Sequence, residues 1–255
     1  MHPQATMNIA LQLSAIGVID RENAQICDVS IGAIRHWRAG RRRASSGTTA
    51  SKTNTCPRCH SRPLDEPAYA YLLGLYLGDG HITHGPRDVY ALAIACSDDW
   101  PGLMDAAQQA LAAAMPTSSV CRVQQHGCTM VKSYSKHWPC LFPQHGPGRK
   151  HLRKIELREW QEVIVEKYSG EFAKGLIHSD GWRGNNRVRR TLADGDHWYE
   201  YPRYQFSNES GDILRLCGEA LDRLGVVWRY SRRNSISVAR REAVARLDEF
   251  IGPKY

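Results

Sequence analysis

The sequence has 255 residues, of which 42% are hydrophobic and 24% charged, a composition typical of a soluble globular protein with a sizeable core. No apolar run approaches the length of a membrane span and the N-terminal residues lack the pattern of a secretory signal, so we expect a cytoplasmic protein without a membrane partner. The 34 Lys and Arg outnumber the 26 Asp and Glu and give a formal net charge of +8, which favours a polyanionic partner, above all nucleic acid.

The first predicted unit is a small all-α domain over residues 7–43. The stretch 20–40 has the spacing of a helix-turn-helix and resembles that of bacterial DNA-binding proteins, with Ser30 able to cap the second helix. Asp28 lies where the motif usually has glycine, and aspartate tolerates left-handed backbone better than most residues. A plain helical hairpin is the alternative. If the second helix enters a DNA major groove, the expected contacts are Arg35, Arg38, Arg41, Arg42 and Arg43.

Residues 44–64 are poor in apolar residues and rich in Ser, Thr and Arg, which predicts a flexible linker. The linker contains a CxxC sequence, Cys56 and Cys59, which is half of a structural Zn²⁺ site. Two reduced thiols in a linker are the alternative, since cysteines scattered along a chain without a secretory signal are expected to be free. The spacing does not select among the residues that could complete the site, which are His60, His137, Cys140 and His145.

From residue 65 the chain repeats itself. Residues 65–142 and 169–253 each have the pattern of a helix, two strands, a helix, two strands and a helix. We therefore expect an α+β fold in which a pseudo-symmetric pair of α-β-β-α-β-β-α repeats forms one domain over residues 65–253. The segment 143–168 joins the two copies.

The first helix of each copy ends in a small residue, an aspartate and a glycine, in LLGLYLGDG at 72–80 and AKGLIHSDG at 173–181. Gly80 and Gly181 are expected to end these helices as left-handed caps. Two helices with flat stripes of small residues can pack with their backbones in contact. The residues of the stripes are Gly74 and Gly78 in the first copy, and Gly175 and Ser179 in the second.

Such packing would bring Asp79 and Asp180 together at one end of the helix pair. The partial negative charge of each helix C-terminus and the repulsion between the carboxylates both oppose this arrangement. A divalent cation offsets both effects, and carboxylates with the backbone carbonyls of Gly78 and Ser179 would make an oxygen-rich site for Mg²⁺ or Mn²⁺. Such an ion can activate water and stabilise the leaving oxygen of a phosphodiester.

The paired motifs resemble the two LAGLIDADG motifs of the homing endonuclease family, in its single-chain, two-repeat form, over residues 65–253. The resemblance implies two saddle-shaped antiparallel sheets that lie along a DNA major groove, with the motif acids at Asp79 and Asp180. The family also tends to place a basic residue near the start of the helix after its fourth strand, close to the cleaved phosphate. Lys136 and Arg240 occupy that place here and complete the implied catalytic set.

The chain departs from the name-giving motif at Leu77 and His178, where the motif has aspartate, and at Lys174, where alanine or glycine is usual. The added helix-turn-helix resembles bacterial regulators, including a sporulation regulator family, which use a LAGLIDADG scaffold to bind DNA without cutting it. Those regulators lack the acid pair, whereas this chain has both aspartates.

Three functions remain open. A metal-dependent, site-specific DNA endonuclease accounts for the acid pair; a transcriptional regulator accounts for the helix-turn-helix; and an RNA splicing cofactor is disfavoured, because the deep major groove of RNA excludes a recognition helix. We expect a monomer, associated with the nucleoid, that binds a long non-palindromic site because the two repeats differ in their basic residues. These residues are Arg87 in the first copy, and Arg183, Arg187, Arg189, Arg190 and Arg203 in the second.

Overall fold

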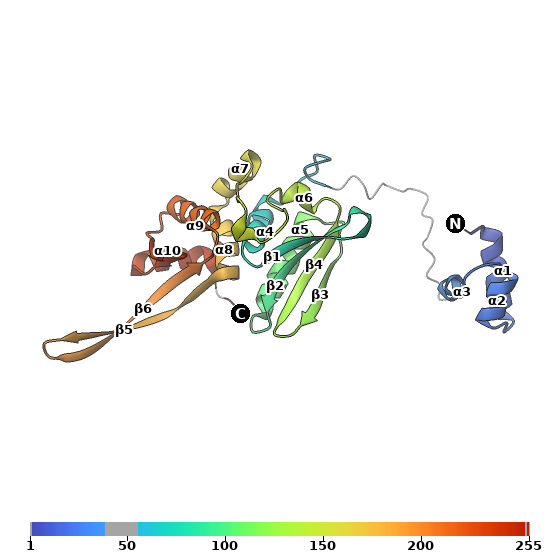
Figure 1. Cartoon of the computed structure of the whole chain (residues 1–255), viewed down its shortest axis with the longest axis horizontal. Helices are drawn as coiled ribbons and strands as arrows, with labels where there is room; N and C mark the ends of the chain where they lie inside the picture. Colours follow the sequence, from blue (N-terminus) through green and yellow to red (C-terminus); the bar gives the residue numbers. More distant parts are fainter. Residues whose placement is uncertain (1, 39–55, 253, 255) are drawn as a thin grey trace. The chain divides into compact units, whose positions relative to one another are not determined.

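The structure, a computed structural model, describes residues 2–38, 56–252 and 254. It divides into two compact units, Met1–Ser51 and Lys52–Tyr255, whose elements are labelled in Figure 1. Each unit has a hydrophobic core of its own. Three of the predicted DNA contacts, Arg41, Arg42 and Arg43, lie outside the described residues.

Within residues 2–38, the first unit has three helices, α1 (Gln4–Ala15), α2 (Asp20–Ile26) and α3 (Ile31–Arg38). In the turn between α2 and α3, Asp28 has a left-handed φ of 51°, a conformation that aspartate tolerates. The side-chain oxygen of Ser30 accepts a hydrogen bond of 3.2 Å from the backbone N–H of Ala33 and so caps α3 as expected.

A small core holds these helices together. Ala10, Ala24 and Ile34, one from each helix, are buried. The amide of Asn23 is also buried, and its Nδ2 donates to the carbonyl of Ala10 (2.8 Å) and to Ser14 Oγ (2.9 Å), so that this polar group is satisfied. The opposite face of α3 is exposed at Gly32, Arg35, His36 and Arg38.

The second unit is built from two copies of one arrangement. The first copy contains α4 (Glu66–Leu77), β1 (Gly80–His84), β2 (Tyr90–Ser97), α5 (Pro101–Ala114), β3 (Val120–Gln125), β4 (Cys128–Ser135) and α6 (Trp138–Leu141). The second contains α8 (Ser169–Asp180), β5 (Gly181–Leu192), β6 (Gly195–Ser207), α9 (Gly211–Arg223), β7 (Arg229–Arg232), β8 (Ser235–Val238) and α10 (Arg241–Ile251). Both sheets are antiparallel and share one strand order, β1-β2-β4-β3 and β5-β6-β8-β7. The predicted repeat and its α+β class are therefore confirmed.

The segment between the copies contains a helix that the sequence did not predict, α7 (Glu159–Lys167), preceded by a 3-10 turn at Lys150–Leu152. The helix is held by a buried amide rather than by a long apolar stripe. Gln161 Nε2 donates to Tyr69 Oη (2.7 Å), and Gln144 Nε2 donates to Gln161 Oε1 (2.6 Å). Because these partners come from distant parts of the chain, hydrophobic periodicity could not reveal the helix.

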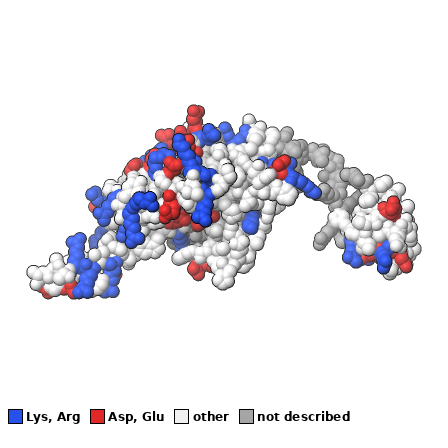
Figure 2. Space-filling model, in the orientation of Figure 1, with Lys and Arg blue, Asp and Glu red and all other residues white. Residues whose placement is uncertain are grey.

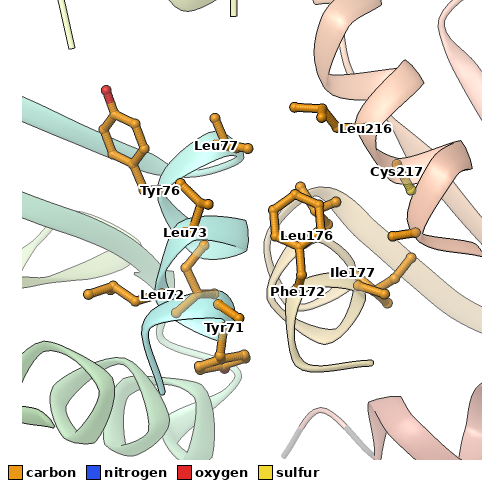
Figure 3. Close-up of a cluster of buried hydrophobic side chains, with 14 of the residues drawn as sticks. Tyr71, Leu72, Leu73, Tyr76, Leu77, Phe172, Leu176, Ile177, Leu216 and Cys217 are labelled. Carbon is orange, nitrogen blue, oxygen red and sulfur yellow. The ribbon is translucent and has the colours of Figure 1, made fainter. Parts of the chain in front are cut away.

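Helices α4 and α8 lie side by side at the centre of the second unit (Figures 1 and 3). Helix α4 is buried on nearly every side, which explains its almost wholly apolar sequence. A Cβ added at Gly74 would lie 2.5 Å from the carbonyl oxygen of Phe172, and one at Gly175 would lie 2.2 Å from that of Tyr71. The two backbones are therefore in direct contact, as the small residues predicted.

The glycines that follow the aspartates do not act as left-handed caps, and this expectation was wrong. Neither Gly80 nor Gly181 has a positive φ, and each begins a strand, β1 or β5. A Cβ on Gly80 would lie 2.4 Å from the Cα of Tyr76, and one on Gly181 would lie 2.6 Å from the Cα of Ile177. Glycine is needed because each strand starts directly against the last turn of its helix.

The CxxC segment is folded onto the second unit. Cys56 is fully buried, and the guanidinium of Arg58 lies 4.4 Å from the ring centre of Trp160 in α7. The prediction of a flexible linker over residues 44–64 is therefore corrected at its C-terminal end, since residues 56–64 belong to the second unit.

We expect Gly175→Ala to lower the free energy of unfolding by about 3 kcal/mol, because the added methyl group would overlap the Tyr71 carbonyl and push the helices apart. Gly211→Ala is the matched control, since nothing lies within 4 Å of a Cβ at that position, and its effect should stay within about 0.5 kcal/mol. Urea denaturation measures both. Equal midpoints for Gly175→Ala and the unaltered protein would contradict the close contact.

Candidate active site at the paired helix ends

Asp79 and Asp180 lie at adjoining ends of the central helices. Asp180 is the last residue of α8, and Asp79 follows the end of α4. A Cβ added at Gly78 would lie 3.2 Å from Asp180 Oδ2 and 2.0 Å from Ser179 Oγ. The two motif ends therefore meet, as predicted, with Asp79 accessible to solvent and Asp180 half-buried.

Both carboxyl groups bind protons more readily than an ordinary aspartate. Displacement of water by the surrounding protein, together with the negative charge of Asp180, raises the pKa of Asp79 to about 6. Burial also raises the pKa of Asp180, against the opposing effect of Asn208, whose Nδ2 donates a hydrogen bond of 2.6 Å to Asp180 Oδ2. Two such groups side by side favour a bound cation.

Lys150 donates hydrogen bonds to the backbone at the C-terminal end of α4. Its Nζ donates to the backbone carbonyls of Tyr76 (2.6 Å), Leu77 (3.0 Å) and Gly78. These are acceptors that a helix C-terminus leaves free, and the helix dipole favours a cation there. Burial lowers the pKa of Lys150 to about 8, although Asp180 and Asp79 act in the opposite direction.

Lys254 donates hydrogen bonds at the C-terminal end of α8. Its Nζ donates to the carbonyls of Ser179 (3.5 Å) and Gly181 (2.6 Å), and burial lowers its pKa while the charges of Asp79 and Asp180 oppose that effect. Neither lysine was predicted from the sequence. The signal that could have revealed them is their similar distance from the aspartate of their own repeat, Lys150 after Asp79 and Lys254 after Asp180.

Two openings flank the acid pair. One, of about 350 Å³, is lined by Asp180, Asn208 and Lys150, among others. The other, of about 120 Å³, is lined by Asp79 and Lys254, among others. In each opening, the aspartate of one repeat faces the lysine that closes the helix of the other repeat, so the pseudo-symmetry of the fold extends to its charged groups.

His178, one of the departures from the family motif, is buried and joins three helices. Its Nε2 lies 3.0 Å from the carbonyl oxygen of Ile251 and therefore carries the proton, which leaves Nδ1 to accept a hydrogen bond of 2.9 Å from Tyr71 Oη. Burial lowers the pKa of His178 to about 4. The imidazole is thus neutral and packs α8 against α4 and α10.

Lys136 and Arg240 are both exposed, Lys136 just before α6 and Arg240 just before α10. The cations whose charge lowers the pKa of Asp79 are Lys150 and Lys254. A contact of Lys136 or Arg240 with a phosphate stays a prediction. The carbonyls of Gly78 and Ser179, predicted as metal ligands, each accept a hydrogen bond from a lysine Nζ, and their role as ligands also stays a prediction.

The arginines predicted in the second repeat line the long hairpin of β5 and β6, where Figure 2 shows Lys and Arg side chains gathered. The guanidinium of Arg187 lies 4.3 Å from the ring centre of Trp198, and that of Arg190 lies 5.7 Å from the ring centre of Tyr199. Arg189 forms an ion pair with Asp196. These exposed pairs hold cationic groups on an extended β-ribbon, a shape that a DNA major groove admits.

Of the other arginines predicted to contact DNA, two are held by hydrogen bonds to neighbouring side chains and one is exposed in a turn. Arg183 makes two hydrogen bonds of 2.8 Å to Asp248 in α10, and Arg203 Nε donates to Ser237 Oγ (2.9 Å). Arg87 is exposed in the 3-10 turn Pro86–Asp88 between β1 and β2, with a left-handed φ of 61°.

In the first unit, Arg35 and Arg38 both pair with Asp20, the first residue of α2, at 3.1 Å and 2.6 Å. Both arginines remain more than half exposed. Their predicted contact with DNA is untested, and it would have to compete with an acidic partner within the unit.

The zinc candidates come together in part. Cys56 and Cys59 lie with His137 and Cys140 in one cluster, whereas His145 packs its ring against Tyr90 (5.9 Å between centres).

In the portion of the chain that is described, no helix combines the length and apolar character needed to cross a membrane.

No protein-family model matches the sequence, and no curated protein matches it. Among solved structures, mesophilic variants of the homing endonuclease I-DmoI match with 17% identity over 74% of this chain and 97% of that chain, at a TM-score of 0.44. I-DmoI in complex with DNA and Ca matches with 19% identity over 74% and 91%, at 0.44. The LAGLIDADG meganuclease I-AabMI bound to uncleaved DNA matches with 10% identity over 71% and 82%, at 0.46. Likenesses this remote carry no argument about activity.

The molecule itself has the features that the sequence resemblance implied. Two motif helices pack backbone to backbone, each is followed by an antiparallel sheet, and the strand order is the same in both sheets. The chain therefore has the pseudo-symmetric two-repeat α+β fold that the sequence predicted. Asp79 and Asp180 reach the same end of its central helix pair.

The pKa of Asp79, about 6, lies above its ordinary value of 3.8. The folded state therefore binds more protons than the unfolded state between these values, and the free energy of unfolding contributed by this group falls as the pH rises from about 4 to about 6. We expect Asp79→Asn to raise the melting temperature at neutral pH without divalent cations, and to leave it nearly unchanged near pH 4. Melting curves at both pH values test this, and the same stabilisation at both would contradict it.

Proposed function

We propose that the chain is a site-specific, double-stranded DNA endonuclease of the homing type that depends on a divalent cation, Mg²⁺ or Mn²⁺. The observation that carries this proposal is the meeting of Asp79 and Asp180 between two openings, each with its own lysine. A DNA duplex has two strands to cut, and a site with one aspartate and one lysine on each side suits a reaction on both.

The acid pair fits a divalent cation. The negative charge of Asp180 raises the proton affinity of Asp79, so a divalent cation held by these carboxylates would take the place of the proton and remove the repulsion. The candidate ligands are these two carboxylates with the carbonyls of Gly78 and Ser179. When bound, the ion would lower the pKa of a water molecule and stabilise the leaving oxygen of the phosphodiester.

The lysines have a different part in the reaction. Lys150 and Lys254 hold positive charge at the openings, where a phosphate would approach, and charge placed in advance near a reacting phosphate stabilises its transition state. Lys150, with a pKa of about 8, can also exchange a proton near neutral pH. Their hydrogen bonds to the helix ends fix both ammonium groups in position.

Binding to DNA would use the hairpins of both repeats. The β5–β6 hairpin is much longer than its counterpart β1–β2 and carries more arginines, so the halves of the protein would read different sequences. The DNA site would then be long and non-palindromic. Because both aspartates belong to one chain, a monomer suffices.

A transcriptional regulator that binds without cutting is the alternative from the sequence. It would explain the three-helix unit but not the acid pair, whose mutual repulsion has a cost that binding alone does not require. The endonuclease accounts for both features, with the three-helix unit as an additional DNA contact.

We expect Asp79→Asn and Asp180→Asn each to abolish DNA cleavage in Mg²⁺ while leaving DNA affinity within about threefold, because the carboxylates serve the cation rather than base contacts. Asp105→Asn, an exposed aspartate of α5 that pairs with Arg122, is the matched control and should cut normally. Selection from a randomised DNA library gives the site, and gel assays then measure cutting and binding. Cleavage at the unaltered rate by either variant would refute the assignment.

We also expect removal of residues 1–51 to shorten the DNA footprint and weaken binding, while cleavage of bound DNA persists. The removed part coincides with the first unit, so the CxxC segment stays in place.

Arg187→Gln should reduce the slope of log affinity against log salt concentration by about 1, because the variant loses one cationic contact with DNA. Arg215→Gln is the control, since Arg215 lies on α9 and pairs with Glu219. An unchanged footprint after the deletion, or equal slopes for the two variants, would contradict this arrangement.

A further inference from the structure

A cluster of three thiols and one imidazole lies on the second unit, apart from the residues that line the two openings at the acid pair. Cys56 and Cys59 come from the segment that begins this unit. His137 directly precedes α6, and Cys140 lies within α6. One ligand atom from each of the four residues lies within 4.8 Å of every other. Residues far apart in the sequence thus converge on one small volume.

The distances suit a tetrahedral metal site. With Zn–S bonds of about 2.3 Å, neighbouring sulfurs in a tetrahedron lie about 3.7 Å apart. Here Cys59 Sγ lies 3.3 Å from Cys140 Sγ, and Cys140 Sγ lies 3.8 Å from His137 Nδ1. A disulfide would need about 2.05 Å between sulfurs, so the pair Cys59 and Cys140 is too far apart to be one.

The backbone around the cluster supports thiolate ligands. The N–H of Cys59 points at Cys56 Sγ (3.4 Å), and the N–H of His60 donates to the carbonyl of Cys56 (3.0 Å), so the CxxC forms a tight turn. An N–H directed at sulfur stabilises negative charge on it. At the other end, Ser135 Oγ accepts a hydrogen bond of 3.1 Å from the N–H of His137, which fixes the start of α6.

We propose that Cys56, Cys59, His137 and Cys140 bind one structural Zn²⁺. A Cys₃His set with every tetrahedral position filled by protein is typical of structural rather than catalytic zinc. The ion would join the segment where the chain enters the second unit to α6 of the first repeat. Cys56 and Pro57 are buried in that segment, whereas most of its other residues are exposed. A metal cross-link would therefore add stability that its small apolar area cannot supply.

The test is the metal content of the full chain. Protein purified with a reductant and dialysed against zinc-free Mg²⁺ buffer should retain one Zn²⁺ per chain by mass spectrometry of the elements. Replacement by Co²⁺ should give the visible bands of tetrahedral cobalt and a thiolate-to-cobalt charge-transfer band. Neither readout depends on DNA cleavage.

Cys59→Ser should lose most of the zinc and the charge-transfer intensity. Because Cys59 is exposed, this variant removes little packing, and circular dichroism can verify that it is folded. Cys121→Ser is the matched control, an exposed cysteine on β3 of the same repeat, and should keep its zinc.

Several results would overturn the proposal. These are a metal-free protein that gives no cobalt–thiolate band, full zinc retention in Cys59→Ser, and a Cys59–Cys140 disulfide that persists in the reductant. Retention of zinc in His137→Asn with its loss in His60→Asn would overturn the assignment of His137, since the His60 ring packs against that of His137 (5.6 Å between centres).

Discussion

The contact between the backbones of α4 and α8 determines where every other part of the second unit lies. With glycine at positions 74 and 175, the helices approach until a Cβ on either would overlap the carbonyl of the other. Dense packing of this kind tolerates little displacement, so the ends of the two helices are fixed relative to each other. The sheets that start from those ends are fixed with them, and so is the distance between the two aspartates.

That constraint creates an electrostatic difficulty, which the chain offsets with its own lysines. A carboxylate at a helix C-terminus is repelled by the partial negative charge of the helix dipole, and here the two carboxylates also repel each other. Lys150 and Lys254 donate to carbonyls in the last turns of α4 and α8. Their charges lower the pKa of Asp79, which the displacement of water and the charge of Asp180 raise. The pKa of Asp79 nevertheless stays raised, at about 6, so a cation bound beside this carboxyl group would take the place of its proton.

The sequence predicted features that depend on local pattern. The repeat, the order of helices and strands along each copy, the paired stripes and the meeting of Asp79 and Asp180 all follow from periodicity and from small residues at helical spacing. It did not predict the roles of Lys150 and Lys254, which lie outside the predicted helices and strands and donate to backbone atoms distant in the sequence. It recognised Cys56 and Cys59 as half of a site, but only the folded chain selects His137 and Cys140. The glycines after the aspartates were misread, because their requirement comes from a strand and not from a turn.

One pair of facing positions breaks the symmetry of the duplicated fold. Gly78 leaves space that the side chain of Ser179 occupies, since a Cβ at Gly78 would lie 2.5 Å from the Cβ of Ser179. Two copies of the second repeat could not pair in this way, because each would bring a serine to a place that accepts only glycine. The second repeat therefore favours the first repeat over a copy of itself at this position. A gene that encoded the second repeat alone would not restore this helix pair by dimerisation.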